Sequence, residues 1–350
     1  MAVPALQKPF RAALITHSGG PHLSAYVPAL AETTEVTQLS VSDPSGEIVP
    51  AAKKAWGSRM TAVYQDPAEL FRKEKPNLAL ITMEAALSPP VIAAALDAGC
   101  HVLAEKPACL QASDFRPLVE NAKSRGLQLV LALGNRIDPV IVEARRLVTS
   151  GAIGQHYGVE SHIIADQTRL TRPAYHKTWI AQKARAGGGH LIWLGIHWID
   201  LAMFVTGSPI QEVSAFTGNV GGQPIDTEDS AVVAMRFANG TFGTLTSGYY
   251  LDRSYHSMLK VWGSHGWLEV RKHTDNPLEW YSRKEPDPRV RRYEGPKEPS
   301  GYTPFVRHIV RSCLGLEAPT LNADDSMRAL ETVYACYRAA ANGSRQRVSV

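Results

Sequence analysis

Cysteine is scarce in this sequence and forms no recognisable motif. The chain of 350 residues contains four cysteines, with neither a Cys-x-x-Cys pair nor zinc-type spacing, which argues against a cysteine-based zinc or redox site. They are Cys100, Cys109, Cys313 and Cys336. This usage fits a reducing compartment, and residues 1–10 lack the basic and apolar regions of a signal peptide. We therefore expect a cytoplasmic protein.

Long apolar runs and long charged runs are also missing. The longest apolar run, residues 191–205, is interrupted by His197 and Asp200 and is too short to span a bilayer. The formal net charge is only +4, and the densest basic patch, residues 289–292, lies in a polar, proline-rich segment typical of a solvated loop. Neither a membrane nor a nucleic acid is therefore expected as a partner. Internal repeats and low-complexity segments are absent as well.

What the sequence does have is an ordinary globular composition, 44% apolar and 20% charged, over a length that favours two domains. In residues 1–134, short apolar runs alternate with helical patterns. The expected strands are 12–16, 36–41, 78–82, 101–104 and 127–133, and the expected helices are 21–31, 67–73, 89–98 and 113–124. Strands separated by helices imply right-handed crossovers, so this pattern predicts an α/β domain with a doubly wound parallel sheet.

Residues 135–350 have a different character. The expected elements are helices at 139–150, 190–206 and 325–341, and strands at 157–164, 230–237, 241–249, 260–262 and 267–271. Asn239-Gly240 between two of these strands is a strong hairpin signal. The pattern predicts a second, α+β domain with an open, mostly antiparallel sheet. Because an uncovered sheet face usually meets a partner subunit, a homodimer or homotetramer is expected.

The first expected strand leads into a glycine-containing turn, where a dinucleotide fingerprint would place glycines at three positions. Thr16, Ser18 and Pro21 occupy those positions, and Gly19 and Gly20 would move the tight backbone approach along the loop. Pro21 suits the first helical position and leaves a helix N-terminus free to face an anion. Asp43, after the second strand, is placed to accept the ribose hydroxyls of NAD. The alternative is a nucleotide fold that has lost its nucleotide.

Glu105-Lys106-Pro107 ends an apolar strand, at the edge where an α/β sheet presents its catalytic groups. Because Lys106 precedes a proline, its backbone is extended, which aims the side chain away from the strand end. A lysine there can stabilise a developing alkoxide, with Glu105 as its ion-pair partner. A surface salt bridge is the alternative, and the histidine described next favours the catalytic interpretation.

A Gly187-Gly188-Gly189 loop runs into an apolar helix that carries His190, Trp193 and His197. Their spacing at i, i+3 and i+7 predicts that one helical face carries all three. His197 is suited to act as general base toward a hydroxyl proton at neutral pH. Trp179, beside basic residues, can stack on the apolar face of a sugar. For His190 and Trp179, purely structural roles stay open.

A metal site is the alternative use of these histidines. His190 and His197 would be separated by about 10 Å along a helix, which is long for one ion unless the helix begins after His190. His162, on the preceding strand, could add a ligand.

Several segments together resemble the Gfo/Idh/MocA family, the relatives of glucose–fructose oxidoreductase and inositol dehydrogenase. They are residues 98–107, 135–139, 150–154, 187–200, 228–230 and 236–240. The resemblance implies a Rossmann domain, an open-faced sheet domain used for oligomerisation, and NAD(P)-linked oxidation of sugars or polyols. It implies that Lys106 is the active-site lysine, with a cis bond to Pro107, and that His197 is the catalytic histidine. The chain departs from the family pattern at the fingerprint glycines, at Trp193, where an aspartate is usual, and around Met83.

The sequence therefore predicts an NAD- or NADP-dependent oxidoreductase that acts on a secondary alcohol of a sugar, sugar acid or cyclitol, with Lys106 and His197 handling the proton. Cofactor contacts are expected from Thr16, Ser18, Gly19, Gly20, Asp43, Met83, Glu105 and Lys106, and substrate contacts from Arg136, Trp179, His190 and Trp193. The alternative is a lyase, isomerase or glycoside-cleaving enzyme with tightly bound NAD or with a metal at His162, His190 and His197. A non-catalytic sugar-binding or regulatory protein is a third possibility.

Overall fold

The computed structural model describes residues 9–251, 253–272 and 274–349. The chain folds into two compact units, the first made of residues 1–134 and 300–326, the second of residues 135–299 and 327–350. The sequence predicts a second domain that contains all of residues 135–350. The structure differs at residues 300–326, which return to the first unit.

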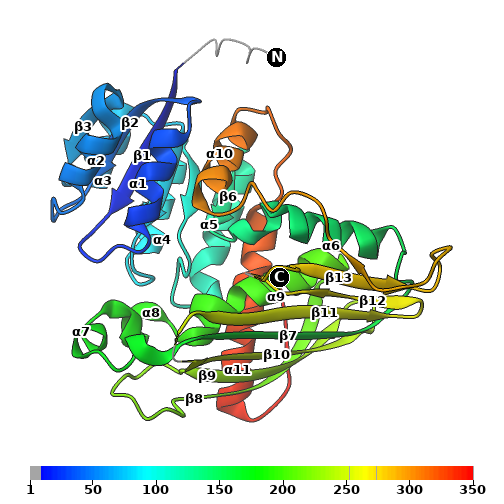
Figure 1. Ribbon diagram of the computed structural model, residues 1–350. Helices are drawn as coiled ribbons and strands as arrows, with labels where there is room; N and C mark the ends of the chain where they lie inside the picture. Colours follow the sequence, from blue (N-terminus) through cyan, green and yellow to red (C-terminus); the bar gives the residue numbers. More distant parts are fainter. Residues whose placement is uncertain (1–8, 252, 273, 350) are drawn as a thin grey trace. The chain divides into compact units, whose positions relative to one another are not determined.

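Within the described residues, the first unit contains a six-stranded sheet in the order β3-β2-β1-β4-β5-β6 (Figure 1). The strands are β1 (Phe10–Thr16), β2 (Val36–Ser42), β3 (Met60–Tyr64), β4 (Leu78–Thr82), β5 (His101–Ala104) and β6 (Leu129–Leu131). The helices between them are α1 (Leu23–Glu32), α2 (Val49–Trp56), α3 (Pro67–Glu74), α4 (Ser88–Asp97) and α5 (Ala112–Ser124). Every neighbouring pair of strands is parallel, which confirms the predicted doubly wound sheet.

The strand order determines where this unit can bind a ligand. β1 pairs with β2 on one side and with β4 on the other, so the winding direction reverses beside β1. In open α/β sheets the crevice for a ligand lies outside the carboxyl ends of the strands at such a reversal. The loop after β1 and the segment after β4 therefore flank the expected site.

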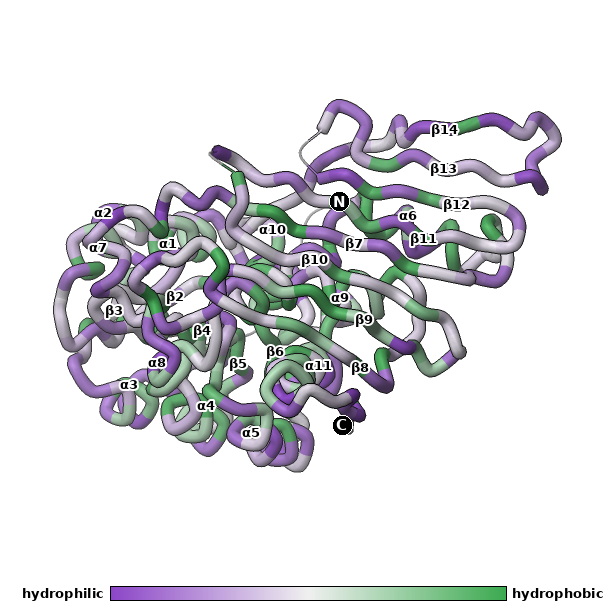
Figure 2. Tube along the Cα trace, turned by 90° about the horizontal axis from the view of Figure 1, so that it is seen from below, coloured by the Kyte–Doolittle hydropathy of each residue, from purple (hydrophilic) through white to green (hydrophobic). Residues whose placement is uncertain are grey.

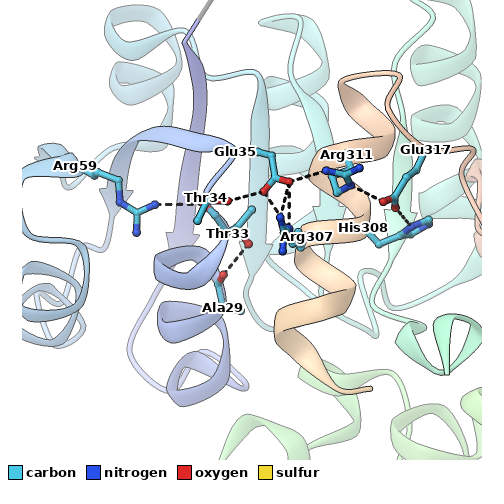
Figure 3. Close-up of polar contacts among 9 residues, drawn as sticks. All are labelled: Ala29, Thr33, Thr34, Glu35, Arg59, Arg307, His308, Arg311 and Glu317. Atoms are coloured by element: carbon cyan, nitrogen blue, oxygen red, sulfur yellow. Dashed lines mark hydrogen bonds and ion pairs between the residues drawn. The ribbon is translucent and has the colours of Figure 1, made fainter. Parts of the chain in front are cut away.

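Residues 300–326 are held to the first unit by an ion-pair cluster around Glu35 (Figure 3). Helix α10 (Tyr302–Cys313) packs against α1. The carboxylate of Glu35, just before β2 and only 3% exposed, accepts from Arg311 Nη1 at 2.8 Å and lies 3.1 Å from Arg307 Nη2. Arg311 and His308 both bond to Glu317 further along the segment. A buried carboxylate matched by arginines explains why this segment joins the first unit.

Within its described residues, the second unit contains a nine-stranded sheet in the order β14-β13-β12-β11-β7-β10-β9-β8-β15. The strands are β7 (His156–Asp166), β8 (Ile210–Gly218), β9 (Ser230–Phe237), β10 (Phe242–Leu251), β11 (Tyr255–Gly263), β12 (Gly266–Val270), β13 (Leu278–Ser282), β14 (Arg291–Arg292) and β15 (Gln346–Arg347). The helices are α6 (Pro139–Thr149), α7 (Pro173–His176), α8 (Lys183–Ala186), α9 (Ile196–Thr206) and α11 (Ala323–Asn342). Only β7 and β10 are parallel neighbours in this described sheet, which confirms the mostly antiparallel prediction.

Helices cover one face of the second sheet and leave the other face open. Helices α6 and α9 pack against one face, contacting β12, β7 and β11. On the other face the strands lie side by side (Figure 2), and large apolar side chains on them are exposed. Phe216 is 83% exposed and Phe242 60% exposed. An open sheet of this kind agrees with the predicted α+β architecture.

The helical stretch Lys183–Thr206, counted as one helix of 24 residues, is long and apolar enough to cross a membrane by length and composition alone. In the structure, 83% of its apolar window is buried inside the protein. A buried core helix meets the same criterion, so this stretch is weak evidence for a membrane span.

Candidate active site

The loop after β1 lies tightly against the end of β4. A Cβ atom on Gly20 would lie 2.1 Å from Thr16 Oγ1 and 2.8 Å from the carbonyl oxygen of Thr82, so only glycine fits there. Gly19 has a φ of 76°, which favours glycine as well. Thr16 Oγ1 donates to the carbonyl oxygen of Thr82 at 2.9 Å, which ties the loop to the neighbouring strand. This close backbone packing fits a dinucleotide cradle in which Gly19 and Gly20 replace the missing fingerprint glycines.

Asp43, predicted to accept the ribose hydroxyls, is buried, and its carboxylate holds its own loop together. It accepts from the backbone N–H and the hydroxyl of Ser45, at 3.0 and 2.6 Å, and from the backbone N–H of Ile48 at 3.0 Å. Glu47 is the exposed acid of this loop, and its Oε1 accepts the hydroxyl of Ser18 at 2.9 Å. Sequence reasoning missed Glu47. The sequence feature that could have pointed to Glu47 is its position four residues after Asp43, in the same loop after β2.

The buried pair of Glu105 and Lys106 follows β5. The two residues are 2% and 3% exposed, Lys106 Nζ lies 3.9 Å from Glu105 Oε1, and the bond to Pro107 is cis, as the family resemblance predicted. Tyr26 donates its hydroxyl to Glu105, and His22 Nδ1 lies 3.3 Å from Oε2. Burial alone would raise the pKa of the Glu105 carboxyl, but the contacts with His22, Lys106 and Tyr26 outweigh burial and lower that pKa. The lysine thus faces a carboxylate that stays ionised near neutral pH.

Met83, directly after β4, is 9% exposed, and its contact with the cofactor stays a prediction. The neighbouring Glu84 donates its backbone N–H to His17 Nε2 at 2.9 Å, which links the end of β4 to the loop after β1. The structure therefore brings Thr16, Met83 and Glu105 to the same carboxyl edge of the first sheet.

In the second unit, the glycine triplet lets a buried carboxylate cap the next helix. Cβ atoms on Gly188 and Gly189 would lie 2.2 Å from the Tyr337 hydroxyl and 1.9 Å from the carbonyl oxygen of Glu228. The Glu228 carboxylate accepts from the backbone N–H groups of Gly189 and Leu191, at 2.6 and 2.9 Å, and from the Tyr337 hydroxyl at 2.7 Å. Burial raises the pKa of Glu228 despite these bonds. Glu228 therefore ties the glycine loop to the start of this helix.

The helix that carries the candidate histidine begins with a π-helical turn at Leu191–Gly195, and α9 follows. Such turns change the angular spacing of side chains. The helix face predicted from the i, i+3, i+7 spacing is therefore not the face that is accessible to solvent. His190 and Trp193 are 0% and 6% exposed. Between residues 190 and 200, only Leu194 and His197 are half-buried rather than buried. The accessible face of this helix therefore carries His197 beside Leu194.

His190 contacts the covered face of the sheet. Its Nδ1 lies 2.6 Å from the hydroxyl of Ser247, and its ring meets the Tyr249 ring edge to face, with centroids 4.3 Å apart. His162 pairs in register with Thr246, the neighbour of Ser247, and so points to the opposite, open face. There its Nε2 lies 2.9 Å from His256 Nδ1.

The metal alternative at His162, His190 and His197 is therefore wrong, because side chains on opposite faces of a sheet cannot share one ion. In the described ranges, no group of three or more His, Cys, Asp and Glu residues is placed to hold a metal.

The remaining predicted substrate residues are buried in the second unit. Trp179 and Trp193 pack in a T-shaped pair with centroids 5.7 Å apart. Arg136 forms a bidentate ion pair with Asp200, with Nε 3.0 Å from Oδ2 and Nη2 2.6 Å from Oδ1. This buried ion pair connects Arg136 to α9, and contact of Arg136 with the substrate stays a prediction. Lys106 and His197 belong to different units, so their approach to one substrate stays a prediction.

A doubly wound sheet with a glycine cradle at its switch point, joined to an open-faced antiparallel sheet, defines a two-domain protein of the Rossmann dinucleotide-binding class. Residues 19–133 match the family model described as "Oxidoreductase family, NAD-binding Rossmann fold". Residues 141–269 match the "GFO/IDH/MocA C-terminal domain". The chain belongs to the Gfo/Idh/MocA family, as its motifs indicated. The first match begins inside the loop after β1, where the fingerprint departs from the family pattern.

Curated relatives are similar over part of their length. Myo-inositol 2-dehydrogenase of Thermotoga maritima is 26% identical over 210 residues, 58% of this chain and 59% of that protein. D-glucoside 3-dehydrogenase of Escherichia coli is 27% identical over 216 residues, 57% of this chain and 60% of that protein. The matched part of this chain thus spans about three fifths of these relatives.

Solved structures match the whole fold. GenD2 from gentamicin A biosynthesis, in complex with NAD, is 26% identical with a TM-score of 0.79, covering 98% of this chain and 97% of that one. Levoglucosan dehydrogenase, in complex with NADH and levoglucosan, has a TM-score of 0.84 at 18% identity, covering 98% and 100%. The second likeness shows the fold alone. The family model supports the prediction of NAD or NADP as cofactor.

Proposed function

We propose that this protein is an NAD- or NADP-dependent oxidoreductase acting on a secondary alcohol of a sugar, sugar acid or cyclitol. The observation that carries the proposal is the buried pair of Lys106 and Glu105 at the carboxyl edge of a sheet of the NAD-binding family. A lysine is seldom buried without a function or a partner, and this one stands where such folds bind their ligands. The names of the relatives, a cyclitol and a glucoside dehydrogenase, suggest the substrate class.

The proposed mechanism assigns the proton to two side chains of this chain. When bound, the nicotinamide supplies the hydride acceptor. His197, half-buried on a mostly buried helix, takes the hydroxyl proton, because imidazole exchanges protons near neutral pH. Lys106 donates a hydrogen bond to the oxygen as negative charge develops on it. Glu105 keeps the lysine oriented and balances its charge.

The partner proposals follow from the open sheet. We infer a homodimer or homotetramer through the face that exposes Phe216 and Phe242, since apolar patches of this kind mark interfaces. A small carbohydrate or polyol is the other expected partner, and the cytoplasm is the expected location. Native mass spectrometry of the wild type and of Phe216→Glu tests the assembly. A variant that remains in the wild-type oligomer would contradict the proposed interface.

The activity is tested by supplying NAD and NADP with a panel of sugars, sugar acids and cyclitols and following reduced nicotinamide. We expect saturable turnover in the wild type and its loss in Lys106→Ala and His197→Ala. Lys53→Ala, an exposed lysine on α2, serves as the control and should keep full activity.

A different result would identify the lyase or isomerase alternative. In that case the cofactor co-purifies with the protein and never accumulates in reduced form, while the sugar is isomerised or cleaved. Native mass spectrometry and product analysis distinguish the two results. Sugar binding that survives both substitutions, with no turnover in any protein, would indicate a binding protein.

A further inference from the structure

Arg169 ends the short turn that follows β7, and it is half-buried among tyrosines. Its guanidinium lies over the ring of Tyr249, 5.3 Å from the centroid, and Nη2 donates to the hydroxyl of Tyr255 at 3.2 Å. Tyr249 in turn shares a side-chain hydrogen bond with Tyr175. Stacking on an aromatic ring holds the planar guanidinium in a defined orientation.

In the ranges 9–251, 253–272 and 274–349, no carboxylate forms an ion pair with this cation within 4 Å, and the charge of Asp166 acts on it from further away. The nearby Asp166 uses its carboxylate to accept the backbone N–H of Thr168 at 2.7 Å. By contrast, buried Arg136 is fully engaged with Asp200. A guanidinium has five N–H donors, and the one hydrogen bond from Arg169 to a described residue uses a single donor, toward Tyr255. A half-desolvated positive charge left in this state favours binding of an anion.

The surroundings connect Arg169 to the candidate active site. Tyr249 contacts the ring of His190, and Leu194 packs against the apolar cluster that contains Tyr249. Leu194 also packs against Trp179 and Trp193. Leu194 is the residue that shares the accessible helix face with His197. Contacts through Tyr249 and Leu194 thus lead from Arg169 to the helix face that carries the proposed base.

We propose that Arg169 binds a carboxylate of the substrate, so that the preferred substrate is a sugar acid rather than a neutral sugar or a cyclitol. A single fixed cation, with tyrosine hydroxyls as its neighbours, balances a singly charged carboxylate and offers the fork geometry that carboxylates accept. A phosphate monoester carries nearly two negative charges, and one of them would stay uncompensated here. This inference rests on the proposed function for its link to catalysis, whereas the anion site itself stands on the Arg169 contacts.

The test compares two substrates, methyl glucuronide, which has a carboxylate at C6, and methyl glucoside, which has a hydroxymethyl group there. Both are assayed with the wild type, Arg169→Gln and Arg169→Lys. In the wild type, kcat/KM is expected to be higher for the glucuronide. In Arg169→Gln it should fall by about 10- to 100-fold for the glucuronide, the loss expected for a charge-assisted bond, and by less than about twofold for the glucoside. Arg169→Lys should fall between the two, because it keeps the charge but loses the fork. Arg172→Gln, an exposed arginine of the same loop, is the matched control.

Calorimetric titration of the same two glycosides and of glucose 6-phosphate separates this inference from the proposed function. Binding of the glucuronide that depends on Arg169, in a protein without dehydrogenase activity, would support the anion site and defeat the oxidoreductase proposal. Oxidation of the glucoside and the glucuronide with equal efficiency, or equal losses for both in Arg169→Gln, would overturn the carboxylate site while leaving the oxidoreductase intact. Tighter, Arg169-dependent binding of the phosphate would overturn the choice of carboxylate.

Discussion

The hydroxyl of Tyr26 donates a hydrogen bond to the carboxylate of Glu105, so helix α1 holds the acid that faces the proposed catalytic lysine. The same carboxylate lies 3.3 Å from His22 Nδ1 and 3.9 Å from Lys106 Nζ. Tyr302 of α10 packs edge to face on Tyr26, with centroids 5.1 Å apart. The position of Lys106 therefore depends on residues far apart in the sequence, all within the first unit.

Glu105→Gln should destabilise the protein in a pH-dependent way. Removing one partner of a buried ionic cluster costs about 3–5 kcal/mol near neutral pH. Because the folded pKa of Glu105 is lowered from 4.5, its contribution to the free energy of unfolding is present above that value and is lost as pH falls through the folded pKa. The stability gap between wild type and variant, measured by denaturant unfolding, should therefore be constant at higher pH and shrink as pH falls below 4.5. A gap of constant size would contradict the ionised, buried carboxylate.

Asp200→Asn should be among the most damaging single changes in the second unit. It leaves the Arg136 guanidinium buried beside a neutral amide, at a cost of about 3–5 kcal/mol. The double variant Arg136→Met/Asp200→Leu should recover most of this loss, because it removes both charges together. Glu143→Gln, which breaks the 2.6 Å pair with exposed Arg146 on α6, should cost less than about 1 kcal/mol. Urea unfolding of the four proteins checks the ranking, and equal losses in the buried and exposed pairs would refute it.

The sequence was sufficient for the parallel core of the first unit, because its central strands are continuous apolar runs. The edge strand β3 was missed, because its residues are alternately half-buried and exposed and resemble a loop. Helix α10 was missed for another reason. Its arginines form ion pairs with Glu35, which lies more than 260 residues earlier in the chain. An ion pair between residues so far apart in sequence leaves no local sequence pattern.

The candidate site could be predicted only in part. Lys106 and His197 stand in local motifs, so both could be singled out from the sequence, and their catalytic roles stay predictions. The π-helical turn at 191–195 could not be singled out, because it depends on Gly195 packing against Ser247, a strand residue distant in sequence, and a Cβ there would lie 2.8 Å from the Ser247 hydroxyl. The contacts of Asp43 within its own loop could not be predicted, because a loop-bonded acid and a ribose-binding acid look the same in sequence, and its ribose contact stays a prediction.

Glu35→Gln should loosen α10 without unfolding the sheet. Burial alone would raise the pKa of Glu35, but hydrogen bonds from Arg311 and Arg307 outweigh it and lower that pKa. The docking of residues 302–313 should therefore weaken in the variant, and in the wild type as pH falls through the folded pKa of Glu35. Hydrogen exchange should show faster exchange in α10 and unchanged exchange in β1 and β4. Glu317→Gln, which removes the more exposed acid of the same cluster, should have a smaller effect, and the reverse order would refute the role given to Glu35.

The wild type should bind NADH more tightly than NADPH, because Glu47 is the exposed carboxylate beside the loop after β1. Its Oε1 lies 2.9 Å from the Ser18 hydroxyl, at the edge where a dinucleotide ribose is expected, and a 2′-phosphate there would meet a like charge. Glu47→Gln keeps the shape and removes the charge, so the NADH preference should fall by about fivefold through weaker exclusion of NADPH, with NADH affinity nearly unchanged. Fluorescence titration of both cofactors measures the two dissociation constants. Glu32→Gln, an exposed acid at the far end of α1, should leave both unchanged. If Glu47→Gln weakens NADH and leaves NADPH unaffected, the carboxylate binds the ribose directly, and exclusion by charge is the wrong account.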